Sequence, residues 1–470
     1  MVLAALVLAA APVMAQSAGA GAALPPEFAA ALAAARIPPE SVSVLVRAVD
    51  GRAAPRLAFR PDAAMNPASV MKLVTGVVAL DTLGPAFTWA TPVYLEGSLA
   101  GGVLRGRVYI KGQGDPKLVL ERLWLLLRRL RALGVNTIDG DLVLDQSAVE
   151  LTAQDPGEFD GEPLRPYNAA PQALLLNFKA IQITFTPNRA TGRAAISFEP
   201  SLAGVQMAAD VPLLAGSCGD YRGQLRADFS DPERVRFGGG YAAACGERVW
   251  SVAYADPGSY AVRAVAGMWR ELGGQIQNGQ VREGRVPPGL TPAFELASPP
   301  LADVLRDINK FSNNVMAQQL FLTLSLRQQG VGSYAGSRDI AERWWRQHFR
   351  EAEFPVPVLD NGSGLSRSGR ITARSLEALL QWAWVAPVMP ELLSSLPIAG
   401  VDGTLRRAQA RAARGSAHLK TGSLRDSAAV AGYVHAQSGR RYVLVAMVNH
   451  PNAAAARPAL DALLDWAIRD

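Results

Sequence analysis

The apolar run that follows Pro67 constrains this chain most, because it places a serine and a lysine on one face of a buried helix. Pro67 suits a first helical turn, and the residues from Val70 to Leu80 are mostly apolar, which predicts a helix inside a core. Ser69 and Lys72 are three residues apart and therefore share a helical face. A hydroxyl at a helix start lies where N–H groups converge, and a buried amine can lose its proton. The pair predicts a serine nucleophile with a lysine base.

Composition makes this pair more informative than its spacing alone. The chain has 27 serines but only 6 lysines against 41 arginines, so a Ser-x-x-Lys match is expected by chance about 0.3 times. Lysine stands here in a chain that otherwise uses arginine for its cations, and only lysine can release a proton at a useful pH. Coincidence is still an alternative for the motif alone, so other segments must decide.

Two further segments supply the groups that such a nucleophile needs. Ser312-x-Asn314 offers a second hydroxyl and an amide, and Lys420-Thr421-Gly422 offers a cation on a strand where glycine lets substrate backbone lie close. A Ser-x-x-Lys helix, a second serine with its asparagine, and Lys-Thr-Gly are the signature of class A β-lactamases and penicillin-binding proteins. All three occur here in the required order, and the set is far more specific than any member.

Length, charge and motif content argue against several other classes. At 470 residues, with 49% hydrophobic and 19% charged, the chain is long enough for more than one folded core. The net charge of +6 favours anionic partners, but arginine is scattered without a basic run, which argues against nucleic acid. We expect no cofactor and no metal, because Gly112-x-Gly114 lacks the third glycine of a dinucleotide loop and the four histidines lack metal-ligand spacing.

The N-terminus and the two cysteines indicate export. Residues 1–15 are almost wholly apolar and end in a small-x-small pattern at Ala15, so we expect a signal peptide and a periplasmic location, although no positive charge follows Met1. The run is too short and alanine-rich for an integral membrane span. In an exported chain the even pair Cys218 and Cys245 favours a disulfide, with two free buried thiols as the alternative.

Hydrophobic periodicity predicts how the motifs are distributed over domains. We expect strands at 43–49, 57–59, 93–97, 104–110, 141–145, 181–185, 194–198, 418–421, 429–434 and 442–448. We expect helices at 67–80, 118–133, 260–272, 301–308, 315–326 and 453–468. The middle of the chain holds no candidate catalytic set. Residues 24–90 and 293–470 are therefore expected to form the catalytic domain, and 91–292 one or two mostly-β inserted domains.

From the first hairpin to the last helix, the chain resembles the low-molecular-mass class C penicillin-binding proteins, the D-alanyl-D-alanine carboxypeptidase/endopeptidase family. Four segments add to the three motifs: Gly114-Asp115-Pro116, the segment 167–174, the segment 360–367 and the segment 400–405. The resemblance implies an α+β fold, in which a transpeptidase/β-lactamase-like domain with an antiparallel sheet and helices is interrupted by inserted domains. It also implies an enzyme that trims peptidoglycan stem peptides and that β-lactam antibiotics inhibit covalently.

The same resemblance implies a role for each motif residue. Ser69 would be the acylated nucleophile, Lys72 its base, and Ser312 the proton shuttle toward the leaving amine. Asn314 would bind the peptide backbone, and Lys420 would hold the terminal carboxylate and polarise Ser312.

The Lys-Thr-Gly strand would complete the substrate site. Thr421, Gly422 and Ser423 would bind substrate, with the hydroxyls of Thr421 and Ser423 on its carboxylate. Backbone N–H groups of Ser69 and Ser423 would form the oxyanion hole.

Two other functions are compatible with parts of the pattern. A β-lactamase would need a water with its own base for fast deacylation, and the sequence shows no such base. A catalytically silent binder of cell-wall peptides or β-lactams would not need Ser69, Lys72 and Ser312 intact. A labelled penicillin and a diacetylated tripeptide ending in D-Ala-D-Ala would separate the three.

Overall fold

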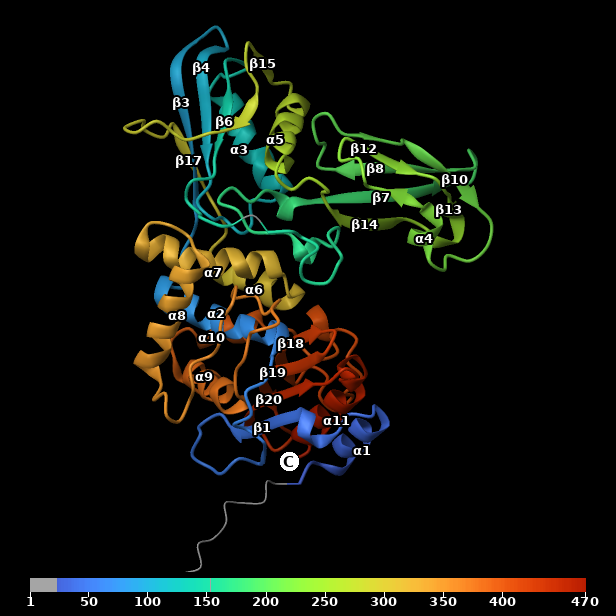
Figure 1. Ribbon diagram of the computed structural model, residues 1–470, viewed down its shortest axis with the longest axis vertical. Helices are drawn as coiled ribbons and strands as arrows, with labels where there is room; N and C mark the ends of the chain where they lie inside the picture. The colour runs from blue at the N-terminus through green and yellow to red at the C-terminus, as the bar shows by residue number, and fades with distance from the viewer. Residues whose placement is uncertain (1–22, 153) are drawn as a thin grey trace, which may run out of the picture.

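The chain ends meet in one antiparallel sheet at the bottom of the molecule (Figure 1). The computed structural model describes residues 23–152 and 154–470, so the expected signal peptide at 1–15 lies outside the described residues. The sheet order is β18-β19-β20-β1-β2, and β1 pairs antiparallel with β20. Its strands are β1 (Val42–Ala48), β2 (Leu57–Phe59), β18 (Ala417–Leu424), β19 (Ser427–His435) and β20 (Arg441–Asn449).

Helices cover both faces of this sheet and form with it the lower body of the molecule. One face packs against α2 (Lys72–Leu83), α6 (Leu301–Phe311), α7 (Asn314–Gln329), α8 (Tyr334–His348), α9 (Ala373–Val385) and α10 (Met389–Ser395). The other packs against α1 (Pro26–Ala34) and α11 (Arg457–Ile468). In β20, Val443 and Val445 belong to the first core and Leu444 and Ala446 to the second. Burial on both faces explains why this strand is apolar throughout.

A second sheet forms the upper body and lies between α2 and α6 in the sequence. Its order is β15-β5-β4-β3-β17, with β6 paired to β4 and β16 paired to β6. The strands are β3 (Ala90–Ala100), β4 (Val103–Lys111), β5 (Thr137–Asp139), β6 (Leu142–Asp145), β15 (Gln275–Gln277), β16 (Val281–Glu283) and β17 (Phe294–Ala297). Helices α3 (Leu120–Ala132) and α5 (Tyr260–Glu271) pack in the same core.

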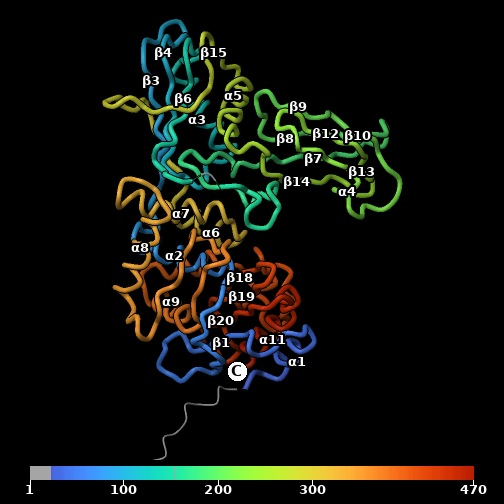
Figure 2. Tube along the Cα trace, in the orientation of Figure 1, coloured from blue at the N-terminus to red at the C-terminus, as the bar shows by residue number. Residues whose placement is uncertain are grey.

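A third region, which we call the arm, projects sideways from the upper body (Figures 1 and 2). One of its sheets has the order β13-β10-β8-β7-β14 and the other β11-β12-β9. Its elements are β7 (Ala180–Asn188), β8 (Arg193–Glu199), β9 (Gln206–Met207), β10 (Asp210–Leu214), α4 (Tyr221–Leu225), β11 (Ala227–Asp228), β12 (Arg234–Phe237), β13 (Tyr241–Ala242) and β14 (Arg248–Ala253). The disulfide Cys218–Cys245 lies in the arm, which confirms that prediction and excludes two free thiols.

The expected α+β fold is confirmed, with two differences in detail. Ser69 lies in a 3₁₀ turn, Ala68–Met71, that leads directly into α2. Such turns are frequent at the N-termini of α-helices. Helices α1, α4, α8, α9 and α10 and strands β5 and β9 to β17 were not predicted. Among the helices of residues 23–152 and 154–470, none is both long and apolar enough to span a bilayer.

Candidate active site

The turn that presents Ser69 is held by Asn66, which bonds two segments that are distant in the sequence. Ala68 has a positive φ of 48°, which is uncommon for a residue other than glycine. The side-chain oxygen of Asn66 accepts from the Ala68 N–H at 2.9 Å, and the Asn66 amide donates to the Ser366 carbonyl at 2.9 Å. Asn449, at the end of β20, accepts from the Asn66 N–H at 2.7 Å. These contacts stabilise a backbone geometry that would otherwise cost about 1–3 kcal/mol.

Two glycines let neighbouring backbone pack directly against this turn. A Cβ at Gly364 would clash with the Ala68 carbonyl, and a Cβ at Gly422 would clash with the Pro67 carbonyl. The loop 360–367 and strand β18 therefore enclose Ser69 from two sides. At Gly422 the close approach that we expected for substrate is made by the protein's own backbone.

Lys72 is fully buried beneath Ser69 and meets three oxygen atoms. Its Nζ lies 2.9 Å from Ser69 Oγ, 2.7 Å from Asn314 Oδ1 and 2.6 Å from the Ser363 carbonyl oxygen. The last two can only accept, so they take two N–H donors. A neutral amine then has its lone pair left for the Ser69 hydroxyl. Burial, and secondarily the charge of Lys420, lower the pKa of Lys72 well below its usual range, which favours this neutral form.

The Ser363 carbonyl is a site group that the sequence did not reveal. It belongs to the segment 360–367, for which a surface turn and a site element were both open. Asn361 Oδ1 accepts from the Ser363 N–H at 3.0 Å, and Thr75 of α2 donates to the Gly362 carbonyl at 2.7 Å. The loop is thus tied to the nucleophile helix, and it fixes one of the two acceptors that keep the Lys72 lone pair directed at Ser69.

Ser312 and Lys420 form a second hydroxyl and amine pair on the opposite side of the cleft. Ser312 ends α6 with a left-handed φ of 54°, and Lys420 Nζ lies 2.8 Å from its Oγ. Lys420 also donates to the Thr421 carbonyl at 2.7 Å. Burial lowers the pKa of Lys420 to about 7, so the amine can exchange a proton near neutrality.

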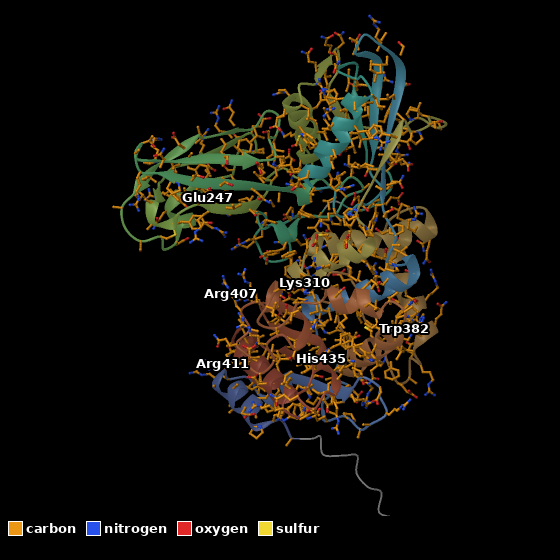
Figure 3. The ribbon with its side chains drawn as sticks, turned by 180° about the vertical axis from the view of Figure 1, so that it is seen from behind. Glu247, Lys310, Trp382, Arg407, Arg411 and His435 are labelled. Carbon is orange, nitrogen blue, oxygen red and sulfur yellow. A yellow bond between two sulfur atoms is a disulfide. The ribbon has the colours of Figure 1, made fainter. Side chains whose placement is uncertain are left out.

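A partly buried ion pair joins the Ser312 turn to the loop 400–405. Lys310 Nζ lies 2.6 Å from Asp402 Oδ2, and Asp402 Oδ1 accepts from the Ile398 N–H at 2.8 Å. This fixes the loop so that Thr404 Oγ1 lies 2.7 Å from Thr421 Oγ1. Lys310 lies at the top of the lower body, on the side that faces the arm (Figure 3). Sequence analysis assigned no role to Lys310, Asp402 or Thr404, although all three stand in the segments that it singled out.

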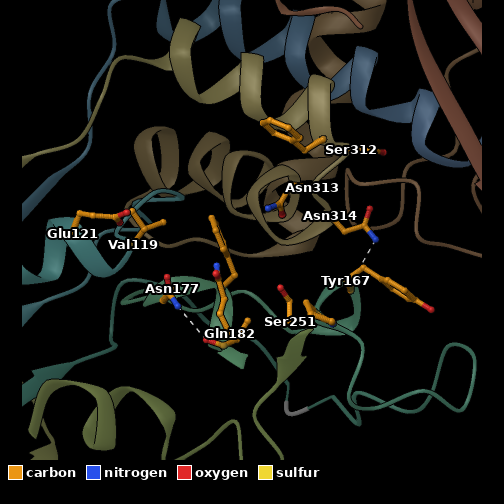
Figure 4. Close-up of a pocket in the computed structure, with 13 residues that line it drawn as sticks. Val119, Glu121, Tyr167, Asn177, Gln182, Ser251, Ser312, Asn313 and Asn314 are labelled. Atoms are coloured by element: carbon orange, nitrogen blue, oxygen red, sulfur yellow. Dashed lines mark hydrogen bonds between the residues drawn. The ribbon is translucent and has the colours of Figure 1, made fainter. Parts of the chain in front are cut away.

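Two adjoining cavities give access to these groups. The strand cavity, about 460 Å³, is lined by Ser69, Ser312, Thr404, Thr421, Gly422 and Ser423 among others. The cleft cavity, about 470 Å³, lies between the lower body and the base of the arm, and its lining includes Ser312, Asn313, Asn314, Tyr167, Phe178 and Ser251 (Figure 4). The predicted catalytic and substrate residues therefore surround one cleft, whereas the two cysteines lie in the arm.

The arrangement is suited to acyl transfer through a covalent serine intermediate. Ser69 contacts a buried amine that can serve as a base in its neutral form, and Ser312 contacts a second amine that can return a proton to a leaving group. Within residues 23–152 and 154–470, no three histidine, cysteine or carboxylate side chains are grouped as metal ligands.

Comparison with known proteins agrees with this chemistry. The model of the D-Ala-D-Ala carboxypeptidase 3 (S13) family matches residues 26–469. The D-alanyl-D-alanine carboxypeptidase DacB of Haemophilus influenzae is 26% identical over 393 residues, which are 82% of this chain and 80% of the relative. The D-alanyl-D-alanine carboxypeptidase of an Actinomadura species is 30% identical over 399 residues, 79% of this chain and 71% of the relative.

A solved structure shares the fold. The crystal structure of penicillin-binding protein 4 (dacB) from Haemophilus influenzae superposes with a TM-score of 0.73 at 24% identity, covering 93% of this chain and 99% of that one. The likeness thus extends over the lower body, the upper body and the arm.

Proposed function

This chain belongs to the D-Ala-D-Ala carboxypeptidase 3 (S13) family, and we propose that it is a serine DD-peptidase in which Ser69 is the acylated nucleophile. Its relatives are named D-alanyl-D-alanine carboxypeptidases, and the motif set is that of a low-molecular-mass class C penicillin-binding protein. The substrate is a peptidoglycan stem peptide ending in D-Ala-D-Ala, or a cross-link between two such peptides. Penicillins acylate the same serine.

The hydrogen-bond pattern around Lys72 is the observation that supports this proposal best. Both N–H donors of a neutral amine are taken by Asn314 and Ser363, so its lone pair can accept the Ser69 proton. Ser69 Oγ then attacks the carbonyl of the penultimate D-Ala. The developing oxyanion is stabilised by the backbone N–H groups of Ser69 and Ser423.

The second half of the acylation step uses the other hydroxyl and amine pair. Ser312 passes a proton to the leaving amine as the peptide C–N bond breaks, and Lys420 resupplies Ser312. Thr421 and Ser423, on the wall of the strand cavity, bind the terminal carboxylate of the departing residue. Asn314 binds the backbone of the peptide that remains as an acyl-enzyme, which water then hydrolyses.

We further propose that residues 24–90 and 293–470 form the catalytic domain and that 91–292 form inserted domains that shape access to the cleft. The apolar segment 1–15 would direct export to the periplasm. Detection of mature protein in the periplasmic fraction, lost when residues 1–15 are deleted, would test the location.

The proposed function is tested with a labelled penicillin and with a diacetylated tripeptide ending in D-Ala-D-Ala. We expect a stable adduct on Ser69 by mass spectrometry and release of D-Ala. Both should vanish in Ser69→Ala and persist in Ser217→Ala, whose serine is exposed in the arm. Rapid turnover of penicillin would instead indicate a β-lactamase, and a folded protein without any adduct would indicate a silent binder.

A further inference from the structure

The outer edge of β14 presents free backbone groups to a cavity beside the catalytic cleft. Beyond the end of β14, the Tyr254 N–H donates to the Lys179 carbonyl, on the β7 side, at 2.9 Å. Ala253 donates to the Leu164 carbonyl, on the opposite side, at 2.9 Å. Backbone groups alternate along a strand, so Val249 and Ser251 also point away from β7. No hydrogen-bond partner is found for the N–H or C=O of either residue among the described part of the chain.

This edge forms one wall of a third cavity, the arm cavity, of about 670 Å³. The indole of Trp250 and the side chain of Val249, which is 49% exposed, supply apolar surface. Arg222 lies over the indole with 5.4 Å between its guanidinium carbon and the ring centroid. Asp220 and Glu162 add carboxylates to the lining. The cavity thus combines an aromatic surface, charged hydrogen-bonding groups of both signs, and the donors and acceptors of a sheet edge.

The arm cavity adjoins the catalytic cleft. It shares Pro166, Tyr167 and Ser251 with the cleft cavity, which in turn shares Ser312 with the strand cavity that contains Ser69. Figure 4 shows Ser251 across the cleft from Ser312, and Tyr167 joined to Asn314 by a hydrogen bond of 3.3 Å. A molecule bound at Ser69 can therefore extend past Tyr167 to the edge of β14 without leaving a lined surface.

We propose that the arm cavity binds an N-acetylated sugar of the glycan strand that carries the stem peptide. An acetamido group has one N–H and one C=O, which match the outward C=O and N–H groups at Val249 and Ser251. The apolar face of a pyranose ring would pack on Trp250, and its hydroxyls would bond Asp220 and Arg222. This inference rests on the proposed function, because only a peptidoglycan substrate brings a glycan to this cleft.

Binding is tested with chitotetraose, a soluble tetramer of N-acetylglucosamine, by calorimetry on the inactive Ser69→Ala protein. We expect Trp250→Ala to weaken binding at least about tenfold. Trp124→Ala is the matched control, since Trp124 is an exposed indole on α3 that lines none of the three cavities, and it should leave binding unchanged. No binding to the parent, or equal affinity in all three proteins, would overturn the proposal.

The role of the strand edge has its own matched pair of variants. Val249→Pro removes an outward N–H but no bond to β7, so an edge strand can tolerate it, whereas Val249→Ala keeps that N–H. We expect proline to weaken chitotetraose binding more than alanine does, with circular dichroism unchanged in both. If proline disturbs the fold, the chitotetraose affinities of Trp250→Ala, Val249→Ala and the parent still test the sugar site. Protection of the Val249 and Ser251 amides by an extended L-peptide but not by chitotetraose would favour strand addition by a protein and refute the sugar site.

Kinetics separate this inference from the proposed function. In active protein, Trp250→Ala should lower kcat/KM for a disaccharide-pentapeptide about tenfold and change kcat/KM for the free pentapeptide less than twofold. Equal losses on both substrates would indicate a general structural effect and would overturn the glycan site. If the parent released no D-Ala from either substrate while chitotetraose still bound, the proposed function would fail and the sugar site would stand.

Discussion

Replacing Lys72 by arginine separates a charge beside Ser69 from a base that takes its proton. Arginine preserves the positive charge, and if charge were sufficient the variant would acylate normally. A guanidinium remains protonated because its pKa lies above about 12, so it cannot accept the Ser69 proton. Among the residues that the structure describes, Lys72 Nζ is the only amine within hydrogen-bond distance of Ser69 Oγ, at 2.9 Å. We therefore expect Lys72→Arg to fail in acylation.

Lys72→Arg should lower both the acylation rate and the stability of the protein, and the two effects have different causes. Loss of a positioned base costs about 10²–10⁴-fold in rate, or about 3–5 kcal/mol of barrier. A guanidinium also has five N–H donors, whereas Lys72 meets three oxygens, so at least two donors would stay unsatisfied in a buried site. Each buried unsatisfied donor costs about 1–3 kcal/mol, so the variant should also be less stable. Lys179→Arg, a second buried lysine, is the control for the cost of fitting arginine.

The assay is stopped-flow acylation by a fluorescent penicillin, together with D-Ala release and a thermal melt. Both rates should fall together in Lys72→Arg, while far-UV circular dichroism stays that of the parent. In the parent, the acylation rate should rise with pH through a group whose pKa is well below 10.5, since burial lowers the pKa of Lys72 and only the neutral amine is active. A folded Lys72→Arg protein that acylates at the parental rate would refute the base assignment and shift it to Ser312 or a water.

Three further predictions concern packing, titration and the arm. Gly364→Ala should lower stability by about 2 kcal/mol or more and abolish the penicillin adduct, because its Cβ meets backbone, whereas Gly216→Ala has open space and should bind normally. Burial lowers the pKa of Lys420 to about 7, so between pH 7 and 9 only the unfolded state keeps that proton. In urea unfolding, the stability of the parent relative to Lys420→Met should therefore rise by up to about 1.4 kcal/mol per pH unit. A stability difference that does not change with pH would contradict this. Reducing Cys218–Cys245 should increase amide exchange in the arm while acylation persists, and loss of acylation would show that the arm is not independent.

The sequence singled out side chains that the structure brings together at the candidate site, because their residue types indicated the chemistry that they could perform. A lysine in an arginine-rich chain, three residues after a serine, already indicated a proton acceptor. The uninterrupted apolar run 442–448 likewise predicted β20. Helices α8 and α9 escaped prediction for different reasons. Charged residues interrupt the apolar stripe of α8, while the run in α9 is apolar enough to fit a strand or a helix.

The features that set the pKa and orientation of those side chains could not be predicted. They are contacts with backbone atoms and the burial of the side chains, and both depend on the folded structure. The Ser363 carbonyl meets Lys72 only after a loop 291 residues away in sequence folds over α2. No residue type marks a carbonyl that will accept from a catalytic amine. Similarly, Lys310 looked like an ordinary cation beside a motif, and its ion pair with Asp402 emerges only when the loop 400–405 packs on the end of α6.

The long interval between Lys72 and Ser312 is tolerated because the chain leaves and re-enters the lower body at the same place. Strand β3 begins the upper body and β17 ends it, and the two pair antiparallel, with Val93 opposite Phe294. The Trp89 and Ser298 backbones at the junction bond each other at 2.8 Å. A long insertion at this junction is therefore tolerated, since the entropy of closing a longer loop grows only slowly with length. This geometry does not fix the interval between Ser-x-x-Lys and Ser-x-Asn, so a search that requires a short interval between them would miss this chain.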